Sequence, residues 1–418
     1  MPTYARGQIV VEDMVGVYHC IARCVRRAFL CGIDPYTGQD YSHRKEWILD
    51  RLRDLAGLFA IEVCGYSVMS NHLHLVLRNR PDIAEQWSAD EIALRWCRVF
   101  PPRDDATGEP VEPGEHDLAM LTANSDRLAE VRRRLANLSW FMRCLCEKIA
   151  RAANHEDGSS GRFWAGRFKS VALLDEAAIL ACSVYVDLNP IRAGLATTPE
   201  ESAYTSGRDR IQSMLQTSTR LTSKDENSPL ETCERPDAWL CELTLQETAI
   251  EPASTTAFGA ASPRGASASE AGPVAIAVAD AVGASHPPAD SGPTSSVAAR
   301  FAALRRLHAR ASDRGFLPIE VEHYVIVLDR TGRELRAEKR GPIPDHLAPI
   351  VERLGLNRSN WVETVRGFGR LFKQAAGRSS SVVGHAARGA GSRARRPLEP
   401  PLCRPLGGHR VLNRHLHA

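Results

Sequence analysis

Residues 69–78 alternate between polar and apolar side chains, and this pattern limits the possible folds more than any other stretch of the chain. The segment reads Met-Ser-Asn-His-Leu-His-Leu-Val-Leu-Arg. Successive side chains of a β-strand point to opposite faces, so the two-residue period predicts a strand. One face carries Leu73, Leu75 and Leu77, and the other carries His72, His74, Val76 and Arg78. We expect the leucine face to pack on a core.

The pair His72 and His74 is the first candidate for a function. Two imidazoles that are two residues apart on one strand face can reach a single metal ion, and neutral imidazole is a common ligand. Alternatively, both are ordinary polar side chains near the end of a half-buried strand. A second His-Leu-His closes the chain at 415–417, in an Arg/Pro/Gly-rich tail without a strand pattern. We expect no site there, because only the strand context gives the pair its meaning.

Hydrophobic periodicity and turn residues predict strands and helices in the first ~210 residues. We expect strands over 15–22 and 61–68, a turn at Ser70-Asn71, and helices over 42–59, 90–99, 126–153 and 176–189. Asp175 is placed to N-cap the last of these helices, and Pro190 and Gly194 are placed to end it. This mixture predicts an α+β fold.

Composition divides the chain into four parts. Residues 1–212 have the composition of a packed domain, with an insertion at about 81–125. Residues 213–298 form an extension whose Ala/Ser/Pro/Gly-rich part, about 250–297, predicts a flexible linker. Residues 299–376 regain periodicity and predict a small, mostly helical C-terminal module. Residues 377–418 predict a disordered basic tail, with eight arginines against the single acid Glu399, and such a tail could add nonspecific phosphate affinity.

Charge, cysteine content and hydropathy exclude several classes of protein. The net charge is +3, and eleven cysteines are scattered without a Cys-x-x-Cys pair, so a zinc knuckle is not expected. The N-terminus has no apolar leader, and no apolar run reaches membrane-spanning length. We therefore expect a soluble cytoplasmic protein, associated with the nucleoid if it binds DNA, and no membrane partner.

Tyr185 and Asn189 form the second candidate feature. Residues four apart share one face of a helix, so their side chains lie one turn apart. The alternative is structural, with Tyr185 as an aromatic residue at the core edge and Asn189 as a C-cap before proline. A tyrosine phenol can attack phosphorus when a metal ion polarises the phosphate. Two imidazoles and an amide oxygen would supply part of a ligand set for Mg²⁺ or Mn²⁺. Mixed N/O ligation without thiolate favours these ions over zinc, although two-histidine sites can accept several metals.

Four blocks in a fixed order make residues 10–210 resemble the single-tyrosine HUH transposases, in particular the REP-associated tyrosine transposases. The blocks are Tyr18-His19 with Arg23, the segment 69–75, Phe163-Trp164 with 167–170, and Tyr185 with Asn189-Pro190 and 192–194. The resemblance implies a ferredoxin-like antiparallel sheet with helices, the HUH nuclease domain. It implies that His72, His74 and Asn189 bind the metal. It also implies that Tyr185 is the catalytic nucleophile, which leaves a 5′-phosphotyrosine and a free 3′-hydroxyl.

The partner implied by this resemblance is single-stranded or hairpin DNA, bound by a monomer or homodimer. Candidate DNA-binding residues are Arg23, Arg26, Arg27, Phe163, Trp164, Arg167 and Lys169. Cations could hold phosphates, and aromatic rings, Phe168 included, could stack on unpaired bases. The alternatives are a solvated surface for the cations and core packing for the aromatic residues.

The resulting expectation is a metal-dependent DNA transposase or nickase that cleaves and rejoins single strands, with no organic cofactor. The main alternative is a domesticated, non-catalytic hairpin-binding or regulatory protein on the same scaffold. A replication or mobilisation nickase would keep the chemistry, but such proteins often carry a helicase domain, and no Gly-x-x-x-x-Gly-Lys-Ser/Thr motif is present.

Overall fold

The computed structural model describes residues 9–25, 30–34, 37–222, 235–245, 310–335, 358–372, 375–377 and 379–389. These residues belong to one compact unit made of 1–245 and 307–418. The expected linker and most of the basic tail therefore lie outside the described residues.

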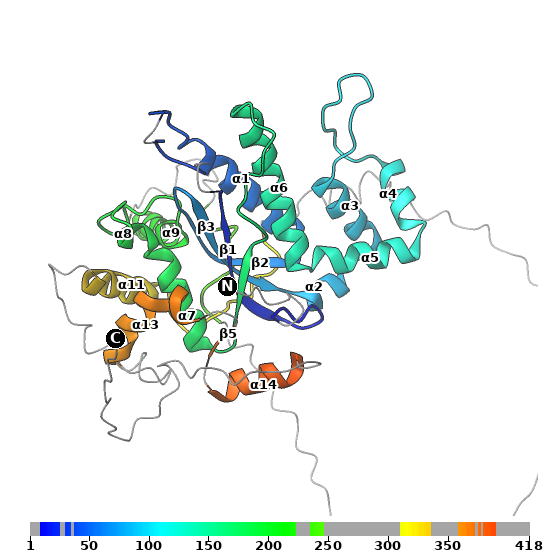
Figure 1. The fold of residues 1–418 in the computed structure, drawn as a ribbon. Helices are drawn as coiled ribbons and strands as arrows, with labels where there is room; N and C mark the ends of the chain where they lie inside the picture. The colour runs from blue at the N-terminus through cyan, green and yellow to red at the C-terminus, as the bar shows by residue number, and fades with distance from the viewer. Residues whose placement is uncertain are drawn as a thin grey trace, which may run out of the picture. The chain divides into compact units, whose positions relative to one another are not determined.

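A five-stranded, open and mostly antiparallel sheet forms the centre of this unit (Figure 1). The strands are β1 (Gly16–Arg23), β2 (Ile61–Val68), β3 (His72–Asn79), β4 (Lys169–Leu173) and β5 (Ala375–Ala376). Their order is β2-β3-β1-β4-β5, and only the β4–β5 pair is parallel. β2 and β3 form a hairpin whose turn is closed by a bond from Met69 N to His72 O of 2.9 Å. The expected turn at Ser70-Asn71 is confirmed.

Two helices cover the leucine face of β3. They are α1 (Arg44–Leu58) and α6 (Leu138–Glu156). Ile48, Leu52 and Leu55 of α1 are fully buried in one core cluster with Leu73, Leu75 and Leu77 of β3. The period-2 assignment of the leucines to a core face is confirmed.

The opposite face of the sheet is also buried, which the alternation of side chains alone did not predict. α7 (Glu176–Asp187) packs against β2, β3 and β4, and its residues 177–187 are all buried. Its outer side is covered by α11 (Val321–Leu335) and α13 (Arg358–Leu371), and α9 (Ser206–Thr222) completes this layer. The strand expected to be half-buried thus lies between two helical layers.

The described part of the expected C-terminal module does not stand apart from this arrangement. α11 and α13 pack on α7, and β5 pairs with Ala172 and Leu173 of β4. α14 (Ser379–Gly389) follows β5. The domain boundaries themselves stay a prediction.

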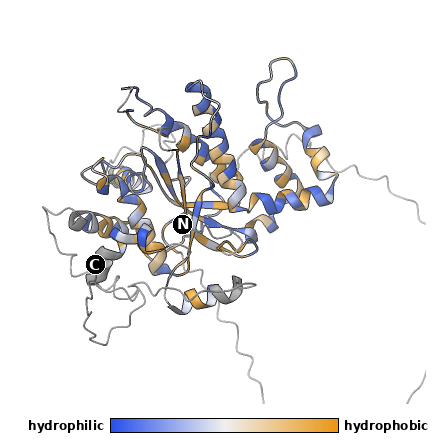
Figure 2. Ribbon diagram, in the orientation of Figure 1, coloured by the Kyte–Doolittle hydropathy of each residue, from blue (hydrophilic) through white to orange (hydrophobic). Residues whose placement is uncertain are grey.

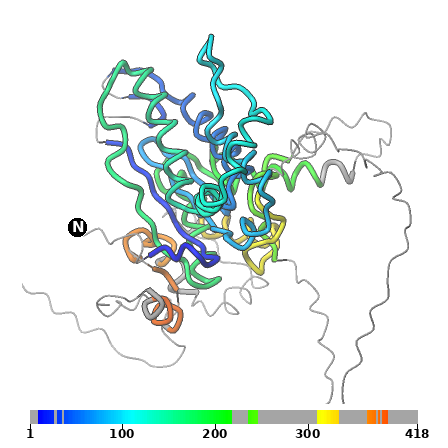
Figure 3. The backbone as a smooth tube through the Cα atoms, turned by 90° about the vertical axis from the view of Figure 1, so that its right-hand side faces the viewer, coloured from blue at the N-terminus to red at the C-terminus, as the bar shows by residue number. Residues whose placement is uncertain are grey.

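The insertion forms a group of short helices beside α6. It contains α2 (Pro81–Gln86), α3 (Ala89–Val99) and α4 (Glu115–Thr122), which pack with α5 (Ser125–Leu135). In Figure 1 this group lies to the right of the sheet and α13 to its left, and Figure 3 gives the backbone turned by 90°. Figure 2 shows apolar residues concentrated on the strands and α7, whereas α5 is mostly hydrophilic.

The expectation of a single long helix over 126–153 is wrong. α5 ends at Leu135, and α6 starts after Asn137, whose side chain accepts hydrogen bonds from Ser139 N (2.8 Å) and Trp140 N (3.2 Å). An asparagine side chain competes with the helical backbone for these amides, so it breaks the helix and caps the next one. The apolar stripe runs across the break and hid it.

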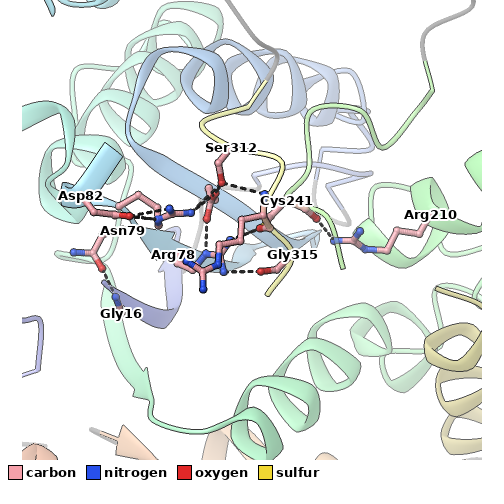
Figure 4. A network of polar contacts seen from close by, with 11 residues as sticks. Gly16, Arg78, Asn79, Asp82, Arg210, Cys241, Ser312 and Gly315 are labelled. Carbon is pink, nitrogen blue, oxygen red and sulfur yellow. Dashed lines mark hydrogen bonds and ion pairs between the residues drawn. The ribbon is translucent and has the colours of Figure 1, made fainter. Parts of the chain in front are cut away.

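A buried ion-pair network joins residues 310–317 to β2 and β3 (Figure 4). Glu62 pairs with both Arg78 and Arg80, and its side chain is fully buried. Arg78 also donates to the Gly315 carbonyl (3.0 Å), and Arg80 donates to the Ser312 hydroxyl (2.9 Å). Each charge of this network is paired, as burial requires.

No helix in the described ranges is both long and apolar enough to cross a membrane.

Candidate functional site

Three histidines meet on the α7 face of the two central strands. His72 and His74 project from β3, as their alternation with the leucines predicts, and their ring centroids are 4.8 Å apart. His19 projects from β1 and stacks on His74 at 5.1 Å between ring centroids. The register pairs His19 with Val76, and paired residues of antiparallel strands share a face. His19 belongs to the first of the four sequence blocks, but no role was expected for it.

Hydrogen bonds through Nδ1 orient both imidazoles of β3. His74 Nδ1 lies 2.9 Å from His19 Nε2, and His72 Nδ1 lies 2.6 Å from the Asn71 side-chain oxygen. The Asn71 oxygen can only accept, so His72 carries its proton on Nδ1 and keeps a lone pair on Nε2. Nε2 of His74 is buried and has no hydrogen-bond partner among the described residues. Both β3 imidazoles are therefore arranged to present Nε2 to a third group.

Burial keeps all three imidazoles neutral at physiological pH. It lowers the pKa of His19 to about 3 and the pKa of His72 to about 4, with the charge of Arg23 adding to the effect at His72. It also lowers the pKa of His74 well below the usual 6.5, and the other two histidines and Arg192 act in the same direction. Neutral imidazole is the form that ligates metals.

Tyr185 of α7 faces the same cluster. Its ring centroid lies 5.6 Å from that of His74 and 5.8 Å from that of His19. Burial raises the pKa of the Tyr185 phenol, whereas the charge and hydrogen bond of Arg192 and the Asn189 side chain lower it. The guanidinium of Arg192 lies 4.8 Å from the ring centroid. The structure therefore brings the tyrosine and the histidine pair, 111 residues apart in the chain, into one site.

Asn189 lies one turn beyond Tyr185 but outside α7. It starts the short helix α8 (Asn189–Arg192), so helical structure continues past Pro190. It ends before Gly194, whose φ is 71°. The Asn189 amide nitrogen donates to the Tyr185 carbonyl at 3.1 Å. This bond is the capping role foreseen as the structural alternative. It leaves the amide oxygen as the Asn189 atom suited to a metal.

The donor set fits a metal ion with nitrogen and oxygen ligands. A buried, unpartnered imidazole nitrogen costs free energy unless something binds it, and Nε2 of His74 is such an atom. His19 would orient the ring of His74 through its contact with Nδ1, as hydrogen-bond partners of metal-binding histidines do. Within the described ranges no three His, Cys, Asp or Glu side chains are arranged to hold a metal. The candidate set is therefore His72, His74 and the Asn189 oxygen, and Mg²⁺ or Mn²⁺ stays a prediction.

Helix α13 covers the tyrosine. Phe368 lies 5.6 Å from Tyr185 and 6.1 Å from His19 between ring centroids. A Cβ at Gly369 would stand 2.9 Å from the Tyr185 hydroxyl, so a glycine there allows the helix to approach the phenol closely. Tyr185 is consequently only 8 % exposed. No local signal in the sequence links α13 to Tyr185.

The expected DNA-binding residues fall into two groups. Arg23 is exposed at the end of β1, opposite His72 in the register, and Lys169 is exposed at the start of β4. Phe163 is buried in the core beneath α6, which favours packing over base stacking. Trp164 and Arg167 lie in the loop before β4, with Trp164 packed against that same core. Arg26 and Arg27 lie outside the described residues.

Comparison with known proteins adds little to this geometry. No family model and no curated protein matches the chain. A solved structure of a REP-associated tyrosine transposase bound to a REP hairpin is similar at 13 % sequence identity and a TM-score of 0.27. The match covers 50 % of this chain and 86 % of that chain. A TM-score of this size does not establish a common fold, so a function has to be argued from the residues themselves.

Proposed function

We propose that the protein is a metal-dependent single-tyrosine transposase that nicks and rejoins single-stranded, hairpin-containing DNA on a ferredoxin-like HUH scaffold. One observation carries the proposal. The ring of Tyr185 lies within 6 Å of two neutral imidazoles, one of which has an unpartnered buried nitrogen. Neither a binding surface nor a core needs an orphaned nitrogen next to a phenol.

The chain's own residues would divide the reaction as follows. Tyr185 Oη attacks a backbone phosphorus, an O–P bond forms, and the bond from phosphorus to the 3′-oxygen breaks. The phenol loses its proton, and the released 3′-oxygen takes one up, which leaves a 5′-phosphotyrosine. The 3′-hydroxyl of another strand can reverse the step, because the phosphotyrosine retains the bond energy. His72, His74 and Asn189 would hold the metal, whose charge would polarise the phosphate.

Arg192 and His19 support these groups. Burial raises the pKa of the Tyr185 phenol overall, and the charge and hydrogen bond of Arg192 offset part of that rise, so Arg192 would stabilise the phenolate as it forms. His19 fixes the ring of His74 through the 2.9 Å contact between His19 Nε2 and His74 Nδ1. With His74 Nδ1 as the donor, the lone pair of His74 Nε2 would face the metal. Arg23 stands beside His72, where a cation can meet the DNA backbone.

A trapped covalent intermediate tests the proposal. The full chain is incubated with Mn²⁺ and 5′- or 3′-labelled single-stranded hairpins, and protein–DNA adducts are resolved on a denaturing gel. We expect an adduct with the label 3′ of the cut that disappears in Tyr185→Phe and persists in Tyr204→Phe, whose hydroxyl binds Glu46 away from the histidines. An adduct that survives Tyr185→Phe would refute the assignment of the nucleophile.

A second candidate function is non-catalytic hairpin binding on the same scaffold. The cover that Phe368 and Gly369 form over Tyr185 favours it, because a nucleophile must reach its phosphate. Hairpin binding without any adduct, over a panel of hairpins and with either Mg²⁺ or Mn²⁺, would select this alternative.

A further inference from the structure

A pocket lies on the face of the sheet opposite to the histidines. It has a volume of about 420 Å³ and opens between α6 and the loop before β4. Its walls include Trp140 and Arg143 of α6 and Trp164, Arg167 and Phe168 of the loop. A volume of this size is within the range of small-ligand sites, about 300–1,000 Å³. The proposed nicking reaction does not use these residues of α6.

Three aromatic rings give the pocket its flat apolar surfaces. Trp140, Trp164 and Phe168 are each half-buried. The indole N–H of Trp164 donates to the Cys146 carbonyl at 2.7 Å, so its ring is held in place. Trp140 packs edge-on against Trp96 at 5.7 Å between centroids. Rigid aromatic rings are suited to stacking on planar groups, because they lose little freedom on binding.

Arginines supply the charge at the rim. Arg143 and Arg167 are exposed, and the guanidinium of Arg143 lies 5.0 Å from the Trp140 ring centroid. The guanidinium of Arg134 also lies over the Trp140 ring, at 4.4 Å from its centroid, but Arg134 pairs with Glu130 and does not line the pocket. Glu147, which is not part of the lining, pairs with Arg143 at 3.3 Å and also with Arg151. Rings flanked by exposed guanidinium groups fit a nucleobase whose phosphates lie at the rim.

The edge of the sheet connects the pocket to the histidine site. Lys169 and Phe168 are neighbours at the start of β4, and their side chains lie on opposite faces. Lys169 pairs with Ile21, which pairs on its other side with His74, so the three share the histidine face. Phe168 lines the pocket. Adjacent strands are about 4.8 Å apart, so the distance from His74 on β3 across β1 to Lys169 on β4 is about 10 Å.

This edge is open among the residues that the structure describes. β5 pairs with β4 only at Ala172 and Leu173, at the far end from Lys169. A single strand of DNA bound at the histidines could therefore leave the site past Lys169 and turn around β4 at Arg167. A duplex is too wide and stiff to follow such a path, which favours an unpaired segment.

We propose that the pocket between Trp140, Trp164 and Phe168 binds an unpaired base of single-stranded DNA that passes from the histidine site around the start of β4. The ligand class is a nucleobase with its flanking phosphates, stacked on the indoles and held by Arg143 and Arg167. This inference rests on the proposed function for the identity of the polymer, but it requires binding alone and no cleavage.

Binding is measured without metal, so that the result is independent of nicking. The protein is the full chain carrying Tyr185→Phe, in EDTA, and the probe is a fluorescein-labelled 30-nucleotide single strand of mixed sequence. Stacking of one base on an aromatic ring is worth about 1–3 kcal/mol, which corresponds to about 5- to 150-fold in affinity. We expect Trp140→Ala to weaken binding by a factor in this range.

Trp47→Ala is the matched control, because Trp47 is a half-buried tryptophan of α1 that does not line the pocket. It should change the affinity less than twofold. Arg167→Gln alters only an exposed side chain, so it keeps the test valid if Trp140→Ala does not fold. Arg167→Gln should weaken binding and reduce the slope of log affinity against log salt concentration by about 1, as expected for the loss of one phosphate contact.

Photocrosslinking identifies the contact directly. A strand with 5-iodouracil at successive positions should crosslink to peptides that contain Trp140, Trp164 or Phe168. Unchanged affinity in both Trp140→Ala and Arg167→Gln, or crosslinks confined to other segments, would overturn the proposal. Equal losses for single-stranded and duplex probes would also overturn it. Normal DNA binding with loss of a protein partner would assign the pocket to a peptide instead.

The two proposals fail in different ways. Loss of the covalent adduct with intact, Trp140-dependent binding would reject the nicking reaction and keep the pocket. An adduct that forms normally in Trp140→Ala, at unchanged affinity for the hairpin, would reject the pocket and keep the nicking reaction.

Discussion

The two buried imidazoles and the half-buried His72 predict a loss of stability in mild acid. Folding holds the pKa of His19 at about 3 and that of His72 at about 4, whereas an unfolded histidine titrates near 6.5. The folded-state pKa is lowered, so the unfolded chain binds protons first. The stabilisation by a neutral buried imidazole is therefore complete above pH 6.5 and declines as the pH falls below it.

The magnitude follows from the size of the shift. Each pH unit below 6.5 removes 1.36 kcal/mol per imidazole until the folded-state pKa is reached. Between pH 7 and pH 5 the loss is about 2 kcal/mol each for His19 and His72. His74, whose pKa is also lowered, adds to it. A protein of ordinary stability, about 5–15 kcal/mol, loses a large part of it in this range.

Urea denaturation at pH 7 and pH 5, in EDTA, measures the effect. His19→Gln removes one buried imidazole, so the difference in unfolding free energy between the two pH values should shrink by about 2 kcal/mol. His116→Gln, at an exposed position of α4, should leave the difference unchanged. A His19→Gln variant that keeps the full pH dependence would refute the reasoning, because the protons would then bind elsewhere.

Three further perturbations test the ion-pair network, the cover over Tyr185 and the break between α5 and α6. Glu62→Gln leaves Arg78 and Arg80 without their buried carboxylate, and urea denaturation should show a loss of about 3–5 kcal/mol; a loss under 1 kcal/mol would contradict the ion-pair network. Phe368→Ala should lower the free energy of unfolding by about 3–5 kcal/mol. It should also speed the nitration of Tyr185 by tetranitromethane, measured by mass spectrometry, and an unchanged nitration rate would show that α13 does not shield the phenol. Asn137→Ala should lower the free energy of unfolding by about 1 kcal/mol and accelerate amide hydrogen exchange in the first turn of α6 only. Accelerated exchange along the whole of α6 would mean that Asn137 is not a local cap.

The sequence was sufficient where a local rule decides the outcome. The period of two separates Leu73, Leu75 and Leu77 from His72 and His74 whatever packs against the strand, and the structure confirms it. Asp175 caps α7 through the Ala178 amide because a capping bond spans only three residues. The mixed α+β class was predicted from the same local patterns.

The sequence was insufficient where distant segments decide. His19 joins His74 only through the register of β1 with β3. α7 has apolar residues on all sides, which is typical of a helix buried all round, and its outer cover comes from α13, more than 170 residues further along the chain. The stripe from Leu135 to Leu138 concealed a cap at Asn137, because hydrophobic period does not report the competition of a side chain for backbone amides.

The position of α13 on Tyr185 has a consequence for the order of synthesis. A ribosome that adds roughly 5–20 residues per second completes Arg192 well before Leu371, 179 residues later. For about 10–40 s strands β1 to β4, the histidines and Tyr185 exist on the nascent chain without Phe368 and Gly369 over the phenol. The apolar outer side of α7 is uncovered during the same interval, so Tyr185 and the face of α7 that packs on α11 and α13 stay exposed together until those helices are synthesised.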